Sequence, residues 1–365
     1  IDNSDNSGNI DNSDNSGDID NSDNSDNIDN SDNSGNIDNS DRPELISAPP
    51  IAPYSPSNAF NPGNDNNAQN PQTINSVCLP PMPAPPLVYF NNASNFPTNS
   101  ADDFILGRND NDAIAGLDGH DTLQGMGGDD IITGGNGSET EENPFSDRDA
   151  IYGNWGRDFL QGNQGEDIIF AGQDDDIAYG GKDNDEIWGD LGNDILMGDL
   201  GSDRLYGGTQ NPAIPDTEGR DMLYGGTGDD FLNGNQGNDS LAGGSGKDTL
   251  HGGKDDDRLY GDAGEDILFG DRGNDSLCGG AGDDTMWGGM GGDRFAIGTT
   301  LGRDLILDFE PGIDAIALTG GLTFADLTLS AGNNATLIRF DTQILAILDN
   351  LPPTAIASTD FIIAN

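Results

Sequence analysis

An aspartate recurs every nine residues through the middle of the chain. It stands at twenty such positions between residues 103 and 293, and every gap but two is nine residues. A glycine lies five positions before nearly every one of these aspartates and an aliphatic residue two positions after, as in GGAGDDTMW at 279–287. A fixed short period of this kind is typical of a solenoid, in which each unit packs only on its neighbours. We therefore expect stacked coils rather than one central core.

Each nine-residue unit predicts a turn followed by a short strand. In GGAGDDTMW the residues GGAGDD form the turn and TMW the strand, whose middle residue points away from the side that its neighbours face. So short a strand is unstable alone, so successive units must pair in parallel about 4.8 Å apart, two units to each coil. The aliphatic residues then face inward, among them Leu123, Leu160, Ile187, Leu205, Leu232, Leu250 and Leu277.

Stacking the units places the repeat aspartates in two columns. Two like charges about 5 Å apart repel by about 1 kcal/mol in bulk water, and by severalfold more at a lower effective dielectric constant. Calcium removes this repulsion, because it accepts about six to eight oxygens from carboxylates and from the carbonyls of tight turns. Magnesium fits poorly, since it demands a tighter octahedron and releases water reluctantly. The pattern therefore indicates multiple Ca²⁺ ions.

The repeat resembles that of the RTX, or haemolysin-type calcium-binding, family. The units GGTGDDFLN (225–233), GGSGKDTLH (243–251) and GGAGDDTMW match its G-G-x-G-x-D-x-U-x pattern. The resemblance implies an all-β, calcium-bound parallel β-roll, with ions held between adjacent turns by aspartate carboxylates and glycine carbonyls. It assigns as metal ligands the aspartates of the best-formed turns, which are Asp130, Asp158, Asp167, Asp194, Asp203, Asp230, Asp239, Asp248, Asp266, Asp275, Asp284 and Asp293.

Other turns depart from this pattern. Four have aspartate instead of the second conserved glycine, a substitution that the left-handed backbone region tolerates; these are Asp110, Asp174, Asp183 and Asp255. The gap from Asp203 to Asp221 reads as a degenerate unit with Pro212 in the aspartate's place, which keeps the phase. The gap from Asp130 to Asp149 reads as a turn carrying Glu139 and a ten-residue expansion.

Composition divides the chain into four segments. Residues 1–41 repeat IDNSDNSGN and are predicted to be disordered, because one apolar residue in nine cannot offset the entropy of ordering. Residues 42–100 are rich in Pro and Asn and read as an extended linker. Residues 101–293 form the β-roll, and the alternating segments DLILDF, DAIAL and ATLIRF within 294–365 predict a small β cap. This last segment also resembles the region that follows the repeats in exported RTX proteins, with a type I secretion signal at its end.

Charge and motifs exclude several function classes. A formal net charge of −52 excludes a nucleic-acid binder, and no apolar stretch is long enough to span a membrane. The sequence has no HExxH or GxSxG motif, so catalysis is not expected. Cys78 and Cys278 lie far apart in the sequence, and a bridge between them is not expected.

The function expected is that of a secreted or cell-surface calcium-binding β-roll, exported unfolded by type I secretion machinery and folded outside the cell. Because the sequence opens inside a repeat, an alternative is the C-terminal carrier module of a secreted enzyme or toxin. A second alternative is a surface adhesin or glycan-binding protein that contacts cell-surface polysaccharide. Its binding face would be a row of rings spaced 18 residues apart, which is Tyr152, Phe170, Trp188, Tyr206 and Tyr224. Stacking of these rings within the sheet explains the same pattern.

Overall fold

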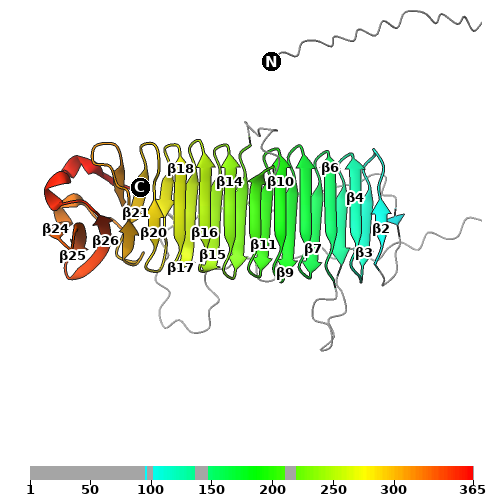
Figure 1. The fold of residues 1–365 in the computed structure, drawn as a ribbon, viewed down its shortest axis with the longest axis horizontal. Coiled ribbons are helices and arrows are strands. Elements are labelled where there is room, and N and C mark those ends of the chain that lie inside the picture. Colours follow the sequence, from blue (N-terminus) through cyan, green and yellow to red (C-terminus); the bar gives the residue numbers. More distant parts are fainter. Residues whose placement is uncertain (1–94, 97–101, 136–146, 210–218, 365) are drawn as a thin grey trace, which may run out of the picture. The chain divides into compact units, whose positions relative to one another are not determined.

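The computed structural model describes residues 95–96, 102–135, 147–209 and 219–364. Its strands alternate between two sheets, and nearly every strand pairs in parallel with the strand two places along the chain (Figure 1). One sheet contains, in spatial order, β1 (Asn95–Phe96), β3 (Ala113–Leu117), β5 (Ile131–Gly135), β7 (Phe159–Gln164), β9 (Ile177–Lys182), β11 (Ile195–Leu200), β13 (Met222–Thr227), β15 (Ser240–Gly246), β17 (Arg258–Gly264), β19 (Ser276–Cys278), β21 (Arg294–Ile297), β23 (Ala315–Leu318) and β27 (Phe361–Ile363).

The second sheet faces the first across a thin core. It contains, in spatial order, β2 (Phe104–Leu106), β4 (Thr122–Gly127), β6 (Ala150–Trp155), β8 (Ile168–Gln173), β10 (Glu186–Leu191), β12 (Arg204–Gly208), β14 (Phe231–Gln236), β16 (Thr249–Lys254), β18 (Ile267–Arg272), β20 (Thr285–Trp287), β22 (Asp304–Ile306), β26 (Gln343–Asp349), β25 (Ala335–Phe340) and β24 (Leu327–Ala331). The predicted all-β parallel solenoid is thus confirmed.

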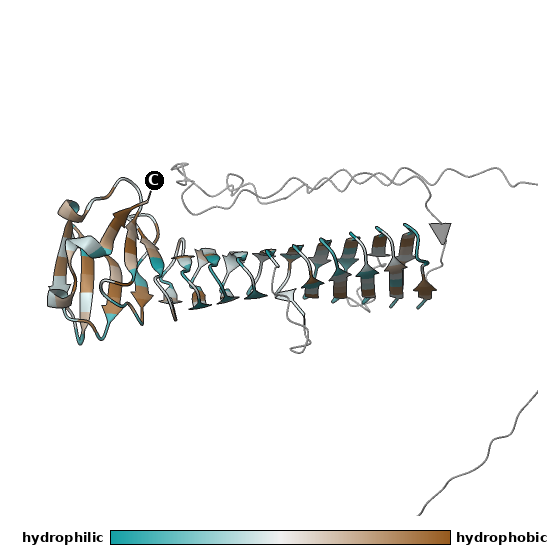
Figure 2. Cartoon of the chain, turned by 90° about the horizontal axis from the view of Figure 1, so that it is seen from above, coloured by the Kyte–Doolittle hydropathy of each residue, from teal (hydrophilic) through white to brown (hydrophobic). Residues whose placement is uncertain are grey.

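The repeat aliphatic residues form the core. They pair in register from coil to coil, as Ile187 does with Leu205 and Leu205 with Leu232. The predicted inward residues are all essentially inaccessible to solvent, with Leu123 and Leu250 at 0% exposure and Leu277 at 1%. Figure 2 shows these hydrophobic positions recurring along the coils and a higher density of hydrophobic residues in the C-terminal strands.

Most strands are longer than the three residues predicted. In β10, pairing continues past Trp188 to Asp190, which aligns with Gly208 of β12. The first turn residues therefore extend the parallel ladder before the chain bends. The bend itself needs positive φ, and three aspartates adopt it where glycine is missing: Asp174 at +79°, Asp183 at +71° and Asp255 at +73°. The fourth predicted substitute, Asp110, does not have positive φ.

The two interruptions of the period act differently from one another. Asp130 and Asp149 lie on opposite edges, one half-coil apart, so the 19-residue interval from one to the other is one nine-residue unit with a ten-residue expansion, as predicted. Residues 136–146, which include Glu139, lie outside the described part of the chain. The prediction that the unit around Pro212 keeps the phase is wrong. The backbone N–H of Asp194 donates to Asp221, 27 residues on, so Asp203 and Asp221 are one half-coil apart instead of two. A proline has neither the N–H nor the carboxylate that each such position supplies.

The region after the repeats closes the stack with a different pairing. β24, β25 and β26 pair antiparallel, and β26 continues the second sheet by pairing in parallel with β22 (Figure 1). Three short 3-10 helices, at Phe324–Asp326, Pro353–Ala355 and Ser358–Asp360, are the only helices in the described residues, and none has the length or hydrophobicity of a membrane span. The strands expected from DLILDF, DAIAL and ATLIRF are observed as β22, β23 and β25.

Two further observations concern the flanks. Cys278 is disulfide-bonded, contrary to expectation, and its partner lies outside the described residues. Asn95–Phe96, placed in the linker by composition, forms β1 and pairs in parallel with β3. The rest of the predicted disordered repeat and linker lies outside the described residues.

Candidate metal centre

Two continuous hydrogen-bonded columns of aspartates run along the two edges of the solenoid. In each column the backbone N–H of one aspartate donates to Oδ1 of the aspartate in the next coil, at 2.7–2.9 Å except at the last bond of the first column. The first column is Asp103, Asp121, Asp149, Asp167, Asp185, Asp203, Asp230, Asp248, Asp266, Asp284 and Asp304. The second is Asp112, Asp130, Asp158, Asp176, Asp194, Asp221, Asp239, Asp257, Asp275, Asp293 and Asp314.

The other carboxylate oxygen, Oδ2, is buried in most of these residues and accepts no hydrogen bond. This holds for Asp103, Asp121, Asp130, Asp149, Asp158, Asp167, Asp176, Asp185, Asp203, Asp230, Asp248, Asp257, Asp266, Asp275, Asp284 and Asp304. A buried polar atom without a partner costs about 1–3 kcal/mol, and a charged one costs more. A repeated cost of this size needs a cation or a proton to offset it.

The turn glycines keep open the space that these oxygens face. A Cβ on Gly225 would lie 2.4 Å from Oδ2 of Asp230 and 2.5 Å from the carbonyl oxygen of Gly243 in the next coil. At Gly270 the same two distances are 2.5 Å, to Asp275 and to the Gly288 carbonyl. A carboxylate oxygen and a carbonyl oxygen from successive turns therefore border one small space. Oxygen donors without nitrogen or sulfur are the donor set that calcium prefers, so the residues present fit calcium.

Carboxylates alone cannot complete such a site. Among the described residues, no three His, Cys, Asp or Glu side chains converge as a metal-binding group. Backbone carbonyls of the turns and water must therefore supply the remaining ligands. Calcium accepts this mixture, whereas zinc prefers nitrogen and sulfur and magnesium requires a smaller octahedron.

The pKa values of the columns show how unfavourable the bare charges are. Burial, followed by repulsion from neighbouring aspartates, raises the pKa of Asp176 and of Asp185 to about 10. Nearer the end of the repeats, burial raises the pKa of Asp284 and of Asp293 only to about 6. Without a bound cation, the most enclosed aspartates of the folded columns would carry protons at neutral pH.

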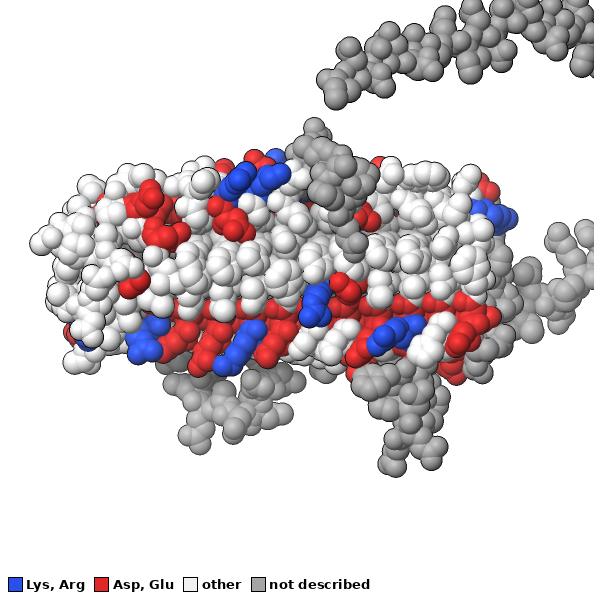
Figure 3. Space-filling model, in the orientation of Figure 1, with Lys and Arg blue, Asp and Glu red and all other residues white. Residues whose placement is uncertain are grey.

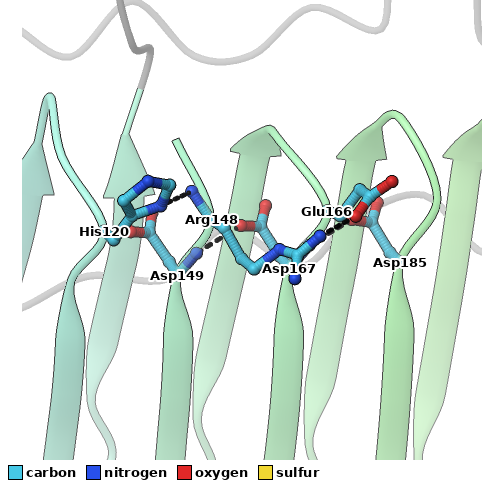
Figure 4. A network of polar contacts seen from close by, with 6 residues as sticks. All are labelled: His120, Arg148, Asp149, Glu166, Asp167 and Asp185. Carbon is cyan, nitrogen blue, oxygen red and sulfur yellow. Dashed lines mark hydrogen bonds and ion pairs between the residues drawn. The ribbon is translucent and has the colours of Figure 1, made fainter. Parts of the chain in front are cut away.

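A second, exposed row of side chains lies outside the first column. The backbone N–H of Arg148 donates to Nδ1 of His120 at 3.0 Å, and the Arg148 guanidinium pairs with Glu166 (Figure 4). Directly beneath, Asp149 donates its N–H to Asp167 at 2.8 Å. On the surface, acidic side chains form a band along an edge of the solenoid, with Lys and Arg set between them (Figure 3). The Lys and Arg side chains of the outer row partly neutralise the acidic edge. They do not pair with the buried Oδ2 atoms of the column, which face the turns.

All twelve aspartates predicted as ligands lie in the columns, six in each. The structure places ten more aspartates in the columns, because the ladder continues through other turns whether or not they have the second glycine. These further members are Asp103, Asp112, Asp121, Asp149, Asp176, Asp185, Asp221, Asp257, Asp304 and Asp314. For most of them the nine-residue spacing itself was the available signal. In three of these turns an aspartate at positive φ takes the place of the second glycine, namely Asp174, Asp183 and Asp255.

Fold and site together define a class: a parallel β-roll whose turns carry buried oxygen ligands for a divalent metal. The model of the RTX calcium-binding nonapeptide repeat matches residues 98–123, 106–140, 152–187, 179–211, 216–250, 242–277 and 268–295. The chain belongs to the RTX calcium-binding nonapeptide repeat family, and its cofactor is Ca²⁺ in several copies.

Several solved structures are similar to parts of the chain. The extracellular lipase LipA of Serratia marcescens has 19% identity and a TM-score of 0.25 over 60% of this chain, which spans 45% of the lipase. A subunit of the mannuronan C5-epimerase of Azotobacter vinelandii has 27% identity and a TM-score of 0.23, covering 43% of this chain and 84% of the subunit. A Ca²⁺-dependent β-helical antifreeze protein from an Antarctic bacterium has 19% identity and a TM-score of 0.26, covering 60% and 83%. No curated protein matches the chain.

Proposed function

We propose that the chain is an exported, non-catalytic β-roll that folds outside the cell when calcium fills its two aspartate columns. The observation that supports this most is the burial of so many Oδ2 atoms without a partner, next to carbonyls of the adjacent turn. The twelve predicted aspartates are its proposed ligands, together with the column members whose Oδ2 has the same surroundings. Such a chain would be unstable where calcium is scarce and stable where it is abundant.

The need for calcium suits export. Extracellular calcium modules bind with dissociation constants of about 10⁻⁴–10⁻³ M, far above the range of cytosolic sensors. A solenoid whose columns repel without calcium would stay unfolded in the cytosol, as passage through an export channel requires. In this proposal, residues 294–365 close the last coil and carry the signal for type I secretion machinery, residues 1–41 are a solvated spacer, and residues 42–100 are a linker that contributes β1 to the first sheet.

Export is tested with the full chain and a C-terminal truncation. In a Gram-negative host that carries a type I exporter for RTX proteins, we expect the full chain in the medium and a chain lacking residues 358–365 in the cell. A chain lacking residues 1–41 serves as the control and should be exported like the full chain. Retention of the full chain, or equal export of the C-terminal truncation, would contradict the proposed role of this segment.

The aromatic row on the second sheet is proposed to be structural. Successive rings of Tyr152, Phe170, Trp188 and Tyr206 are 4.7–5.2 Å apart at interplanar angles of 8–9°. The predicted fifth ring, Tyr224, lies instead on β13 of the other sheet, beside Met197. Rings stacked this closely turn their faces to one another, and sugars stack on ring faces, so this row offers a polysaccharide little surface.

The row nevertheless extends further than predicted. Beyond Tyr206 the position is held by Asn233, and Phe231 bridges the gap with tilted contacts of 5.7 Å to Tyr206 and to His251. His251 then stacks on Phe269, and Phe269 on Trp287. Ring stacking thus accompanies the sheet along much of its length, as expected for cross-strand support.

Trp188→Ala tests this assignment. The substitution removes two stacking contacts, with Phe170 and Tyr206, each worth about 0.5–1.5 kcal/mol beyond burial. The calcium midpoint for folding, which is the calcium concentration at which half of the chains are folded, should therefore rise. Trp155→Ala is the matched control, because Trp155 is 55% exposed and should change the midpoint little. We expect no binding of wild-type protein to dextran or alginate. Polysaccharide binding that Trp188→Ala abolishes at an unchanged midpoint would contradict the structural role.

A further inference from the structure

Three buried aspartates lie beyond the last matched repeat, and their oxygens are satisfied differently. Asp314 accepts the N–H of Asp293 at Oδ1 (2.9 Å) and that of Glu310 at Oδ2 (2.7 Å). Asp360 accepts one backbone N–H at each oxygen, at 3.2 and 2.8 Å. Asp304 accepts the N–H of Asp284 at Oδ1, at 3.5 Å, its buried Oδ2 accepts no N–H or O–H, and its carboxyl group lies against that of Asp284. Asp304 is 1% exposed, so bulk solvent does not reach its carboxyl group.

The turn that ends at Asp304 stacks directly on the preceding turn. Gly302 has φ +108°, and a Cβ there would lie 1.5 Å from the carbonyl oxygen of Gly282. Gly282 forms a parallel bridge with Gly302, and its N–H donates to the carbonyl of Leu301 at 3.3 Å. A Cβ on Gly282 would in turn lie 1.4 Å from the carbonyl oxygen of Gly264 in the coil before. The stack of turn glycines therefore continues past the end of the recognised repeats.

The turn that ends at Asp314 does not continue its stack. Gly312 also has positive φ, +81°, but a Cβ there would have no atom within 4 Å. The preceding turn lies against it only loosely, since a Cβ on Gly292 would lie 3.3 Å from the carbonyl oxygen of Ile313. The two columns therefore end differently: the second at a carboxylate whose two oxygens already accept hydrogen bonds, the first at one that retains a free oxygen.

The sequence explains why this turn is hard to recognise. Gly302-Arg303-Asp304-Leu305-Ile306 keeps the second half of the repeat unit, with Ile306 fully buried as the inward residue. Asp304 follows Asp284 by 20 residues, so two extra residues break the period. The family match ends at residue 295, before this segment.

We propose that Asp284 and Asp304 hold one further calcium ion, between the turn ending at Asp284 and the turn ending at Asp304. The remaining ligands would be backbone carbonyls of these turns and water. The ion would join β20, the last repeat strand of the second sheet, to β22, and so attach the C-terminal strands to the roll on one edge only. The inference rests on the proposed calcium filling of the columns and extends it by one site.

The test compares Asp304→Asn with Asp314→Asn in the full chain. Asparagine keeps an oxygen at Oδ1 but removes the charge and the free oxygen. Native mass spectrometry, at the lowest calcium concentration that gives the full β signal, should show one calcium ion fewer for Asp304→Asn than for wild type. Asp314→Asn should keep the wild-type number, because both carboxylate oxygens of Asp314 already accept backbone N–H groups.

An unchanged calcium number in Asp304→Asn, with a lower calcium midpoint for folding, would overturn the site, since it would mean that only a buried charge was removed. If Asp304→Asn does not fold, wild-type crystals grown in calcium decide: anomalous density beside Oδ2 of Asp304 supports the site, and its absence overturns it. A wild-type chain that binds no calcium at all would instead overturn the proposed function itself.

Discussion

Removal of calcium is expected to abolish most of the β structure of residues 102–364, and millimolar calcium is expected to restore it cooperatively. Without calcium, only the uptake of protons can offset the burial of the Oδ2 atoms, and the core contains one aliphatic residue per nine-residue unit. A site held at about 100 times its dissociation constant contributes about 2.7 kcal/mol, so several sites together decide whether the chain folds. Circular dichroism and small-angle scattering during a calcium titration measure the transition.

Magnesium is the matched control for this titration. At the same concentration it should restore little β signal, because the turns offer carbonyls and carboxylates at the spacing of a larger ion and magnesium retains its water. Equal β content in chelator and in calcium would contradict the account. Equal restoration by the two metals would show that charge neutralisation, rather than coordination, folds the chain.

Acid is expected to replace calcium in part. The pKa of Asp167 is raised to about 9 and that of Asp185 to about 10, chiefly by burial, whereas in the unfolded chain both stay near 3.8. The folded state therefore binds more protons than the unfolded state between these values. The contribution of these two groups to stability is fully present below about pH 4 and is lost as the pH rises to and through about 9 to 10. In chelator, β signal should increase as the pH falls from 9 to 5.5.

The same protons compete with calcium in the loaded protein. The calcium midpoint for folding should therefore rise as the pH falls through this range, because the ligands must be deprotonated to bind. Sedimentation velocity run in parallel separates folding from aggregation of a chain that is losing its negative charge. A metal-free β signal that is flat, or that grows with rising pH, would show that the buried oxygens are not the source of the instability.

The coil was predictable because its determinants are local. The nine-residue spacing alone places Ile187 and Leu205 inward and Asp185 and Asp203 in one column, and each unit repeats the same turn chemistry. The all-β solenoid, the two columns and the calcium cofactor follow from that repetition. The chemistry of aspartate at positive φ, seen at Asp183, extends the same argument to turns without the second glycine.

The features that the sequence did not reveal depend on which segments form a half-coil of the solenoid. Spacing counts Asp203 to Asp221 as two half-coils, yet the ladder treats it as one and so moves Tyr224 to the other sheet. At Asp304 a segment that breaks the spacing nevertheless forms a half-coil. Its turn is two residues too long, yet it stacks because Gly302 fits against Gly282. Both outcomes are decided by backbone contacts between coils, which a period in one chain does not specify.

The central claim is that calcium ions lie beside the buried Oδ2 atoms of the two columns, between successive turns. An anomalous difference map from crystals of the full chain grown in calcium, measured at a long wavelength, tests it most directly. The account predicts two rows of peaks along the edges of the solenoid, next to oxygens such as Oδ2 of Asp230 and Oδ2 of Asp275. Peaks confined to the exposed acidic side chains, with the spaces at Gly225 and Gly270 empty, would contradict it.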